Sequence, residues 1–148
     1  MKRCFEITKG FEGAGVELPK RATSSSAGYD IRSLEDVVIL PGATALISTG
    51  VKAKMPKNEV LLVFIRSSLG IKKGLALANG VGVIDADYYG NPSNDGEIKI
   101  GIRNQGTEEV RIAKGDRIAQ GIFLPYCVTD DDEANSSREG GFGSSGRR

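Results

Sequence analysis

The stretch EVLLVFIRSSLGIKKG, residues 59–74, contains the change of pattern on which the fold prediction depends. Its first part, EVLLVFI, is an apolar run of strand length with β-branched and aromatic side chains, and it ends at Arg66. The following SSLGIKKG, residues 67–74, is the only segment compatible with a short helix, for which Ser67 is a candidate N-cap. The stretch therefore indicates a fold in which strands dominate.

Similar apolar runs lie on both sides of this stretch, and turn residues such as Pro, Gly and Asn separate them. The runs are DVVIL (36–40), ATALIST (43–49), VGVI (81–84), EIKIGI (97–102), EVRIA (109–113) and IAQGIFLPY (118–126). Their spacing, without alternating strands and helices, predicts an all-β sandwich or barrel. A chain of 148 residues has the size of one ordinary domain, which we place at residues 1–128.

The composition changes at about Thr129. The segment TDDDEANSSREGGFGSSGRR, residues 129–148, has Phe142 as its one large apolar side chain, so we expect a flexible arm that cannot fold on its own. A solvated chain end is one interpretation. The other is a segment that closes over a ligand, with Phe142 stacked on a base and phosphates bound by serines and glycine N–H groups. The residues concerned are Gly143, Ser144 and Ser145.

Charge and composition argue against several kinds of function. Twenty Lys and Arg against nineteen Asp and Glu give a net charge of +1, which favours a compact, locally recognised ligand over nucleic acid or a membrane. The sequence shows no signal-peptide pattern and no apolar span, so a cytoplasmic protein is expected. Cys4 and Cys127 are expected to be reduced packing thiols. Because the sequence has no histidine, chemistry is left to carboxylates, hydroxyls, amides and backbone dipoles.

The segment NGVGVIDADYYG, residues 79–90, carries an apolar strand into two carboxylates, Asp85 and Asp87. A turn that ends the strand is the simpler interpretation, because Asp commonly occupies such positions. A carboxylate that acts as a base is the other. The segment alone does not decide between them.

Two further segments carry groups suited to an anion. In IRSSLG, Arg66 and the hydroxyls of Ser67 and Ser68 stand where a strand gives way to a helix start, which suits phosphate. An exposed arginine followed by an N-cap serine is the alternative. In GDRIAQ, Gln120 either donates to an oxyanion or faces water.

Five segments together resemble the ordered motifs of the trimeric dUTPase family. They are AGYDI (27–31), RSSLG (66–70), NGVGVIDADY (79–88), GDRIAQ (115–120) and REGGFGSSG (138–146). The resemblance implies a jelly-roll-like β-clip fold that assembles as a homotrimer, with sites at subunit interfaces and the C-terminal arm crossing to a neighbour's site. It also implies hydrolysis of dUTP to dUMP and pyrophosphate with Mg²⁺, which removes dUTP and supplies dUMP for thymidylate synthesis.

The resemblance implies roles for the matching residues on the phosphate side. Asp85 holds and activates the water that attacks the α-phosphorus. Mg²⁺ is held by the substrate's phosphates without a direct protein ligand, and Asp30 lies near the metal's water shell or near the phosphate-binding arginine. The alternative for Asp30 is an ordinary turn residue. The residues that bind phosphate oxygens are Arg66, Ser67, Ser68 and Gln120.

On the nucleoside side, the resemblance implies that Tyr88 packs on the sugar and excludes a 2′-hydroxyl. Uracil is read by the extended backbone of residues 79–84, and the residues that contribute are Asn79, Gly82, Val83 and Ile84. Gly82 allows close approach. If the strand pleat persists, Asp87 and Tyr89 point to the opposite face and have structural roles.

The sequence departs from the family pattern in two places. The turn after Tyr88 is lengthened to YGNPSNDG, which affects the register of Lys99 as a backbone contact to the nucleoside. The last motif is one residue shorter between Arg138 and Phe142, which affects the register of Arg138 on the phosphates.

Two other functions compete with this one. Deoxycytidine triphosphate deaminase shares the fold and a similar RSSLG, but Gly101 stands here where its pattern has a catalytic glutamate, so deamination is disfavoured. A non-catalytic, regulatory nucleotide-binding trimer is the second. Asp85 argues against it, because binding alone does not need a carboxylate facing an anionic substrate.

Overall fold

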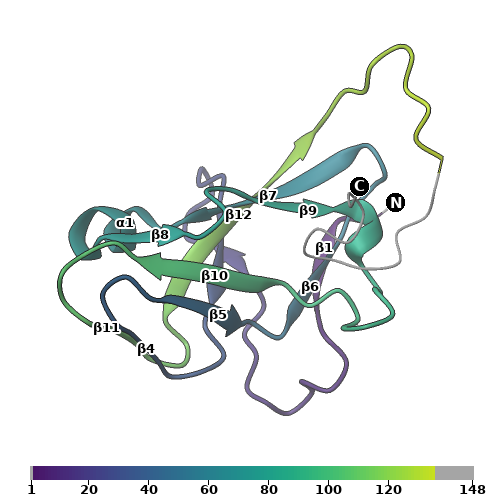
Figure 1. Ribbon diagram of the computed structural model, residues 1–148. Coiled ribbons are helices and arrows are strands. Elements are labelled where there is room, and N and C mark those ends of the chain that lie inside the picture. Colours follow the sequence, from purple (N-terminus) through teal and green to yellow (C-terminus); the bar gives the residue numbers. More distant parts are fainter. Residues whose placement is uncertain (1, 136–148) are drawn as a thin grey trace.

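The largest layer is a five-stranded antiparallel sheet with the strand order β2-β3-β12-β7-β9 (Figure 1). The computed structural model describes residues 2–135. The strands of this sheet are β2 (Lys20–Arg21), β3 (Tyr29–Arg32), β12 (Arg117–Pro125), β7 (Glu59–Ile65) and β9 (Gly82–Asp85). The edge strand β9 pairs with β7 along its whole length, with Gly82 opposite Val63 and Asp85 opposite Val60.

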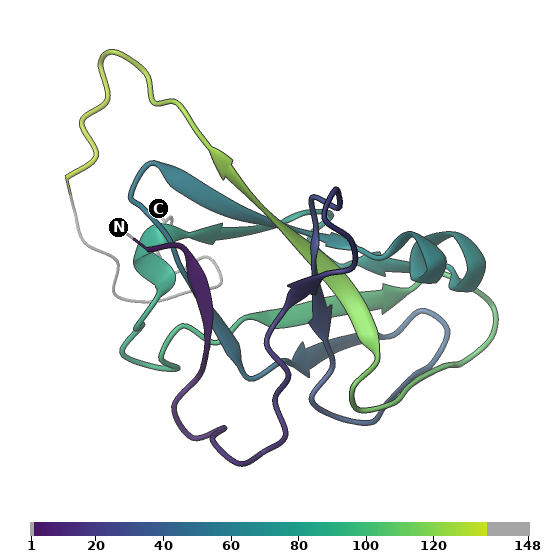
Figure 2. The same cartoon turned by 180° about the vertical axis from the view of Figure 1, so that it is seen from behind.

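Three smaller antiparallel sheets complete the fold. They consist of β5 (Thr44–Ser48), β10 (Lys99–Asn104) and β8 (Leu75–Leu77), of β1 (Cys4–Ile7) with β6 (Val51–Lys54), and of β11 (Val110–Ile112) with β4 (Val37–Ile39). The helices in the described part of the chain are α1 (Ser67–Lys73) and the 3₁₀ helix η1 (Ala86–Tyr88). Seen from behind in Figure 2, α1 lies at the end of the molecule opposite the N-terminus.

One apolar core joins the sheets. Ile31, Leu61 and Ile118 of the five-stranded sheet belong to the same buried cluster as Ile47 and Ile102 of the three-stranded sheet, and all five are fully buried. Full burial of each such side chain stabilises the fold by roughly 1.5–3 kcal/mol. The alternation of buried and partly exposed residues along β7 and β10 produces this core, as expected of strands with one face inward.

The predicted all-β class with one short helix is confirmed. β7 has the predicted bounds, whereas the sheets of the described residues stay open and do not close into one barrel. The N-cap prediction was wrong: Arg66 occupies the N-cap position with extended backbone angles (φ −69°, ψ 139°) and makes no side-chain capping hydrogen bond. Ser67 is the first helical residue.

The prediction for the cysteines was half right. Both are free, but Cys127 is exposed and so is no packing thiol, whereas Cys4 is half-buried. Neither α1 nor η1, the helices within residues 2–135, is long and apolar enough to cross a membrane. Of the predicted arm, residues 129–135 are exposed and lie beyond β12. The predicted site residues that lie outside the described range are Arg138, Phe142, Gly143, Ser144 and Ser145.

Candidate active site

A cavity of about 680 Å³ lies between the edge strand β9 and the strand β10 of the other sheet. Figure 1 shows these two strands one above the other. Seven residues predicted from the sequence line the cavity: Asn79, Gly82, Val83, Ile84, Asp85, Tyr88 and Lys99. Within residues 2–135, the structure therefore brings together in one chain the residues expected on the nucleoside side, along with the Asp85 carboxylate.

The backbone of β9 forms one wall of this cavity. Because β9 is the edge strand and uses one side for β7, its other row of backbone groups faces away from the sheet. A Cβ added to Gly82 would lie 3.0 Å from Cβ of Val63. The close packing of β9 on β7 is therefore a second reason for a glycine at position 82, besides the close approach of a ligand. An outward backbone edge is thus present over residues 82–85, where an edge for base recognition was predicted over residues 79–84.

The prediction of an extended backbone over residues 79–84 was wrong for its first part. Residues 78–81 form a tight turn, in which Gly80 N donates to Leu77 O at 3.0 Å and Val81 N donates to Asn79 O at 2.9 Å. Gly80 has φ +76°, a conformation that glycine adopts without strain. Asn79 therefore lies at the cavity as a turn residue and not as part of β9.

Tyr88 closes one side of the cavity and is 7% exposed. It lies in η1 because the strand ends at Asp85, so the strand pleat does not continue to Asp87 and Tyr89. The Tyr88 hydroxyl donates to Glu97 O at 2.7 Å and accepts from Asn94 Nδ2 at 2.7 Å. Asn94 and Glu97 were missed by sequence reasoning, which treated residues 89–96 only as a lengthened turn.

The loop after Tyr88 is fixed by charged groups from β1 and β6. Asp95 accepts hydrogen bonds from Lys52 Nζ at 2.6 Å and from Lys9 N at 3.0 Å, and these bonds lower the pKa of the Asp95 carboxyl. The Tyr89 hydroxyl donates to Glu6 Oε2 at 2.6 Å, which raises the pKa of Tyr89 to about 12. The structural role predicted for Tyr89 has a physical basis in this bond.

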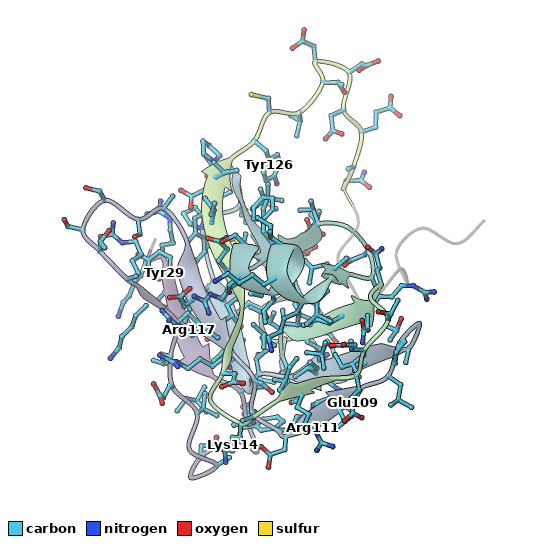
Figure 3. All side chains as sticks on the ribbon, turned by 90° about the vertical axis from the view of Figure 1, so that its left-hand side faces the viewer. Tyr29, Glu109, Arg111, Lys114, Arg117 and Tyr126 are labelled. Atoms are coloured by element: carbon cyan, nitrogen blue, oxygen red, sulfur yellow. The ribbon has the colours of Figure 1, made fainter. Side chains whose placement is uncertain are left out.

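The residues expected on the phosphate side form a second group around Asp30. Its carboxylate lies 3.3 Å from Arg117 Nη1 and 4.0 Å from Arg66 Nε. Arg66 also donates to the carbonyl of Arg117 at 3.3 Å. Figure 3 shows Arg117 on the flank of the molecule that also carries Tyr29. Asp30 lies within β3 and is therefore not a turn residue. Of the other two settings expected for it, these distances favour a position beside Arg66.

Gln120 joins this second group through the strand register, because it pairs with Asp30 across β3 and β12. A Cβ on Gly28 would lie 2.5 Å from Gln120 Oε1, so the glycine leaves room for this amide. Ser67 is exposed and Ser68 half-buried, in the first turn of α1 beside Arg66. Within residues 2–135, the cavity between β9 and β10 is lined by the first group and not by this one.

The donor set was compared with what Mg²⁺ requires. In residues 2–135, no group of three or more carboxylate or thiol side chains is arranged to hold a metal ion. Mg²⁺ commonly keeps several waters and binds one or two carboxylates together with substrate phosphates. The residues present therefore fit a Mg²⁺ held mainly by phosphates, and not one held in a protein cage.

Comparisons with known proteins identify the family. The dUTPase family profile matches residues 14–146. The deoxyuridine 5'-triphosphate nucleotidohydrolase of Lactococcus lactis is 51% identical over 146 residues, which cover 97% of each chain. The crystal structure of the dUTPase from Streptococcus mutans has a TM-score of 0.80 and 45% identity, and the match covers 86% of this chain and 98% of that one.

A variant dUTPase of Staphylococcus bacteriophage 80alpha, solved with dUpNHpp, is 27% identical with a TM-score of 0.71 over 99% of each chain. The fold and these similarities define the class, a jelly-roll-like β enzyme of nucleotide metabolism. The chain belongs to the dUTPase family. The predicted family and enzyme class, dUTP diphosphatase, are thereby confirmed.

Proposed function

We propose that this protein hydrolyses dUTP to dUMP and pyrophosphate, with Asp85 activating the water that attacks the α-phosphorus. The observation that carries the proposal is the position of Asp85 at the end of β9, in the wall of a cavity that also contains Asn79 and Tyr88. An ionised carboxylate beside the reaction centre accepts the proton of the attacking water. In a cytoplasmic setting, the reaction removes dUTP and supplies dUMP for thymidylate synthesis.

The cavity supports recognition of a deoxyuridine. The outward backbone edge of residues 82–84, together with Asn79, offers donors and acceptors to the edge of uracil. The Tyr88 ring is buried in the cavity wall, where it packs on the sugar and leaves no room for a 2′-hydroxyl. Lys99 of β10 completes the contacts from the opposite wall. Crowding of this kind also excludes the 5-methyl group of thymine.

The second group supports binding of the triphosphate. Arg66 offers a planar fork of donors to phosphate oxygens, while Gln120 and the hydroxyls of Ser67 and Ser68 add neutral donors. Asp30 orients Arg66 by their mutual attraction. These groups stabilise negative charge that builds up on the phosphates during the attack.

The separation of the two groups supports a site shared between subunits. One chain presents the nucleoside cavity and, elsewhere, the phosphate-binding group, so a homotrimer that apposes the two groups of neighbouring subunits would complete each site. The arm of residues 129–148 then closes over a neighbour's site. Its contributions would be Phe142 stacked on uracil and donors to the phosphates from Arg138, Gly143, Ser144 and Ser145.

Mg²⁺ is the cofactor that we propose, because a triphosphate carries the oxygen ligands that it prefers. It would offset phosphate charge when bound. Asp30 is the described residue placed to reach its water shell, since its carboxylate lies within the phosphate-binding group.

Deamination receives no support from the cavity. Gly101 lines it without a side chain that could move a proton, and a Cβ there would lie 3.6 Å from Cβ of Ala78. The Asp85 carboxylate in the cavity wall likewise argues against the other alternative, a regulatory binding protein without activity.

One assay distinguishes these functions. Purified protein is incubated with Mg²⁺ and dUTP, dCTP, UTP or dTTP, and the products are separated by chromatography. We expect dUMP and pyrophosphate from dUTP and little turnover of the others. Formation of dUTP from dCTP would indicate the deaminase, and binding without any product would indicate a regulatory protein.

A further inference from the structure

The loop of residues 89–97 contacts the cavity through the hydroxyl of Tyr88. A phenolic hydroxyl has one proton to donate and also accepts hydrogen bonds. Its proton goes to the carbonyl of Glu97 at 2.7 Å, and its oxygen accepts from the amide of Asn94 at 2.7 Å. Both partners belong to the loop, so the side of the ring that carries the hydroxyl is held by the loop.

The amide of Asn94 is itself fixed. Its Oδ1 accepts from Gly96 N at 3.0 Å, and because a backbone N–H only donates, this bond requires the amide nitrogen to point toward Tyr88. The backbone of Asn94 also accepts from Glu97 N at 3.1 Å. The amide therefore has one orientation in which all these bonds form.

The loop packs directly on the backbone of η1. Gly96 has φ +86°, and a Cβ there would lie 2.6 Å from Tyr88 O and 3.0 Å from Tyr89 Cα. In addition, Asn91 N donates to Tyr88 O at 3.1 Å. A side chain at position 96 would separate the loop from Tyr88.

The other side of the loop is fixed to the body of the protein by Asp95. This residue adopts φ +58° and accepts from Lys52 Nζ of β6 at 2.6 Å. Both side chains are largely shielded from water, with 9% of Lys52 and 15% of Asp95 exposed. Lys52 Nζ also lies 4.7 Å from the centre of the Tyr89 ring. Removing one partner of such a largely buried ion pair strongly destabilises the folded protein, because the other charge stays buried without a counter-charge.

We propose that the loop of residues 89–97 is a positioning element for sugar discrimination, in which Asn94 fixes the Tyr88 ring and the Lys52–Asp95 pair fixes the loop. This inference rests on the proposed function, because it assigns the selection of deoxyribose to Tyr88. Asn94 and Lys52 are positioning residues, and they act on the substrate through the ring. Rejection of a 2′-hydroxyl by crowding requires a ring that cannot move aside, and the loop meets that requirement.

The test compares kcat/KM for dUTP with kcat/KM for UTP in the full-length protein with Mg²⁺. In Asn94→Ala, the preference for dUTP should fall about threefold to tenfold, as expected for the loss of one hydrogen bond. Tyr88→Phe keeps the ring and the loop sequence and should give a similar fall. In the double variant the two effects should not add, because Tyr88→Phe already removes the hydrogen bond from Asn94, together with the one to Glu97 O.

Lys52→Met should also lower the preference, whereas Lys54→Met is the matched control that should leave it unchanged. Lys54 lies near the same ring, with Nζ 5.5 Å from the centre of Tyr89, but its side chain is not in the ion pair with Asp95. Melting temperatures are measured for every variant, because a purely structural role would lower stability without changing the ratio of the two substrates.

The outcomes separate the two hypotheses. A wild-type protein that does not hydrolyse dUTP overturns the proposed function, and this inference with it. A wild-type protein that prefers dUTP, with Asn94→Ala and Tyr88→Phe folded and equally selective, overturns the positioning role alone. A fall in preference for Lys54→Met equal to that for Lys52→Met would also overturn the role of the ion pair.

Discussion

The cavity between β9 and β10 and the group around Asp30 differ in how far one chain completes them. The cavity has walls of backbone and buried side chains, including Tyr88 at 7% exposed. The second group lies at the surface, where the side chains of Arg66 and Arg117 are 28% and 40% exposed and both approach Asp30. One chain thus encloses the cavity that we propose for the nucleoside, whereas the groups that we propose for the phosphates stand at its surface.

The largest expected effect tests whether the chemistry belongs to the cavity. Asp85→Asn keeps the shape of the side chain and removes its basic oxygen, so kcat should fall by ~10²-fold or more. Binding of dUpNHpp, measured by calorimetry, should persist. Asp87→Asn is the control two residues away, and its kcat should stay near that of the wild type. If Asp85→Asn keeps more than about a tenth of the wild-type kcat, Asp85 is not the base.

The second effect concerns the arm of residues 129–148, which we compare with the cavity and with the group around Asp30. Truncation after Ser136 should severely reduce dUTP hydrolysis, because closure excludes water and brings donors to the phosphates. The melting temperature should hardly change, because the removed residues 137–148 have Phe142 as their one large apolar side chain. Phe142→Ala should give an intermediate rate. A truncated protein with the full rate would show that the arm is only a solvated end.

A third, smaller effect separates the two groups by what they recognise. Tyr88→Leu keeps apolar volume but loses the ring and should lower the preference for dUTP over UTP. Arg66→Lys loses the bidentate fork and should lower kcat/KM for both nucleotides by about the same factor. Steady-state kinetics give kcat/KM for dUTP and for UTP in each variant, and their ratio is the preference. A change of preference in Arg66→Lys but not in Tyr88→Leu would reverse the assignment.

The smallest effect on the reaction concerns the support of the cavity, and it is measured as stability. The pKa of Asp95 is lowered by hydrogen bonds from Lys52 and Lys9, so its contribution to stability is present above the unfolded pKa of about 3.9 and is lost as pH falls through the lowered value. Asp95→Asn suits the positive φ and removes only the charge. Its melting temperature should lie below that of the wild type at neutral pH, and the gap should narrow in acid. The control Asp131→Asn, at an exposed site, should show no gap.

The sequence predicted the elements in which local pattern and packing agree. The apolar run of β7 gave its bounds, and the lining residues of the cavity followed from the segment around Asp85. β1, β6 and β8 were not predicted, because they are short and, in β6, contain lysines. Lys52 is buried there only because Asp95, far along the chain, neutralises it.

The turn at 78–81 and the 3₁₀ helix η1 were missed for a related reason. The sequence pattern of these residues predicts a continuous strand. The loop that holds Tyr88 adds hydrogen bonds that cannot be predicted from the local sequence pattern. The N-cap position shows the same limit: Arg66, and not Ser67, occupies it with extended backbone angles, so the helix begins one residue earlier than expected. Such details depend on tertiary contacts that a single sequence does not display.

The most direct test of a site shared between subunits is complementation between two inactive variants. Asp85→Asn keeps the phosphate-binding group, and Arg66→Ala keeps the cavity and its carboxylate. Each variant alone should be nearly inactive. If the two groups of neighbouring subunits form each site, co-refolding the variants in equal amounts should restore activity at about a quarter of the sites by random assembly of a cyclic oligomer. An equal mixture no more active than the separate variants would contradict the shared site.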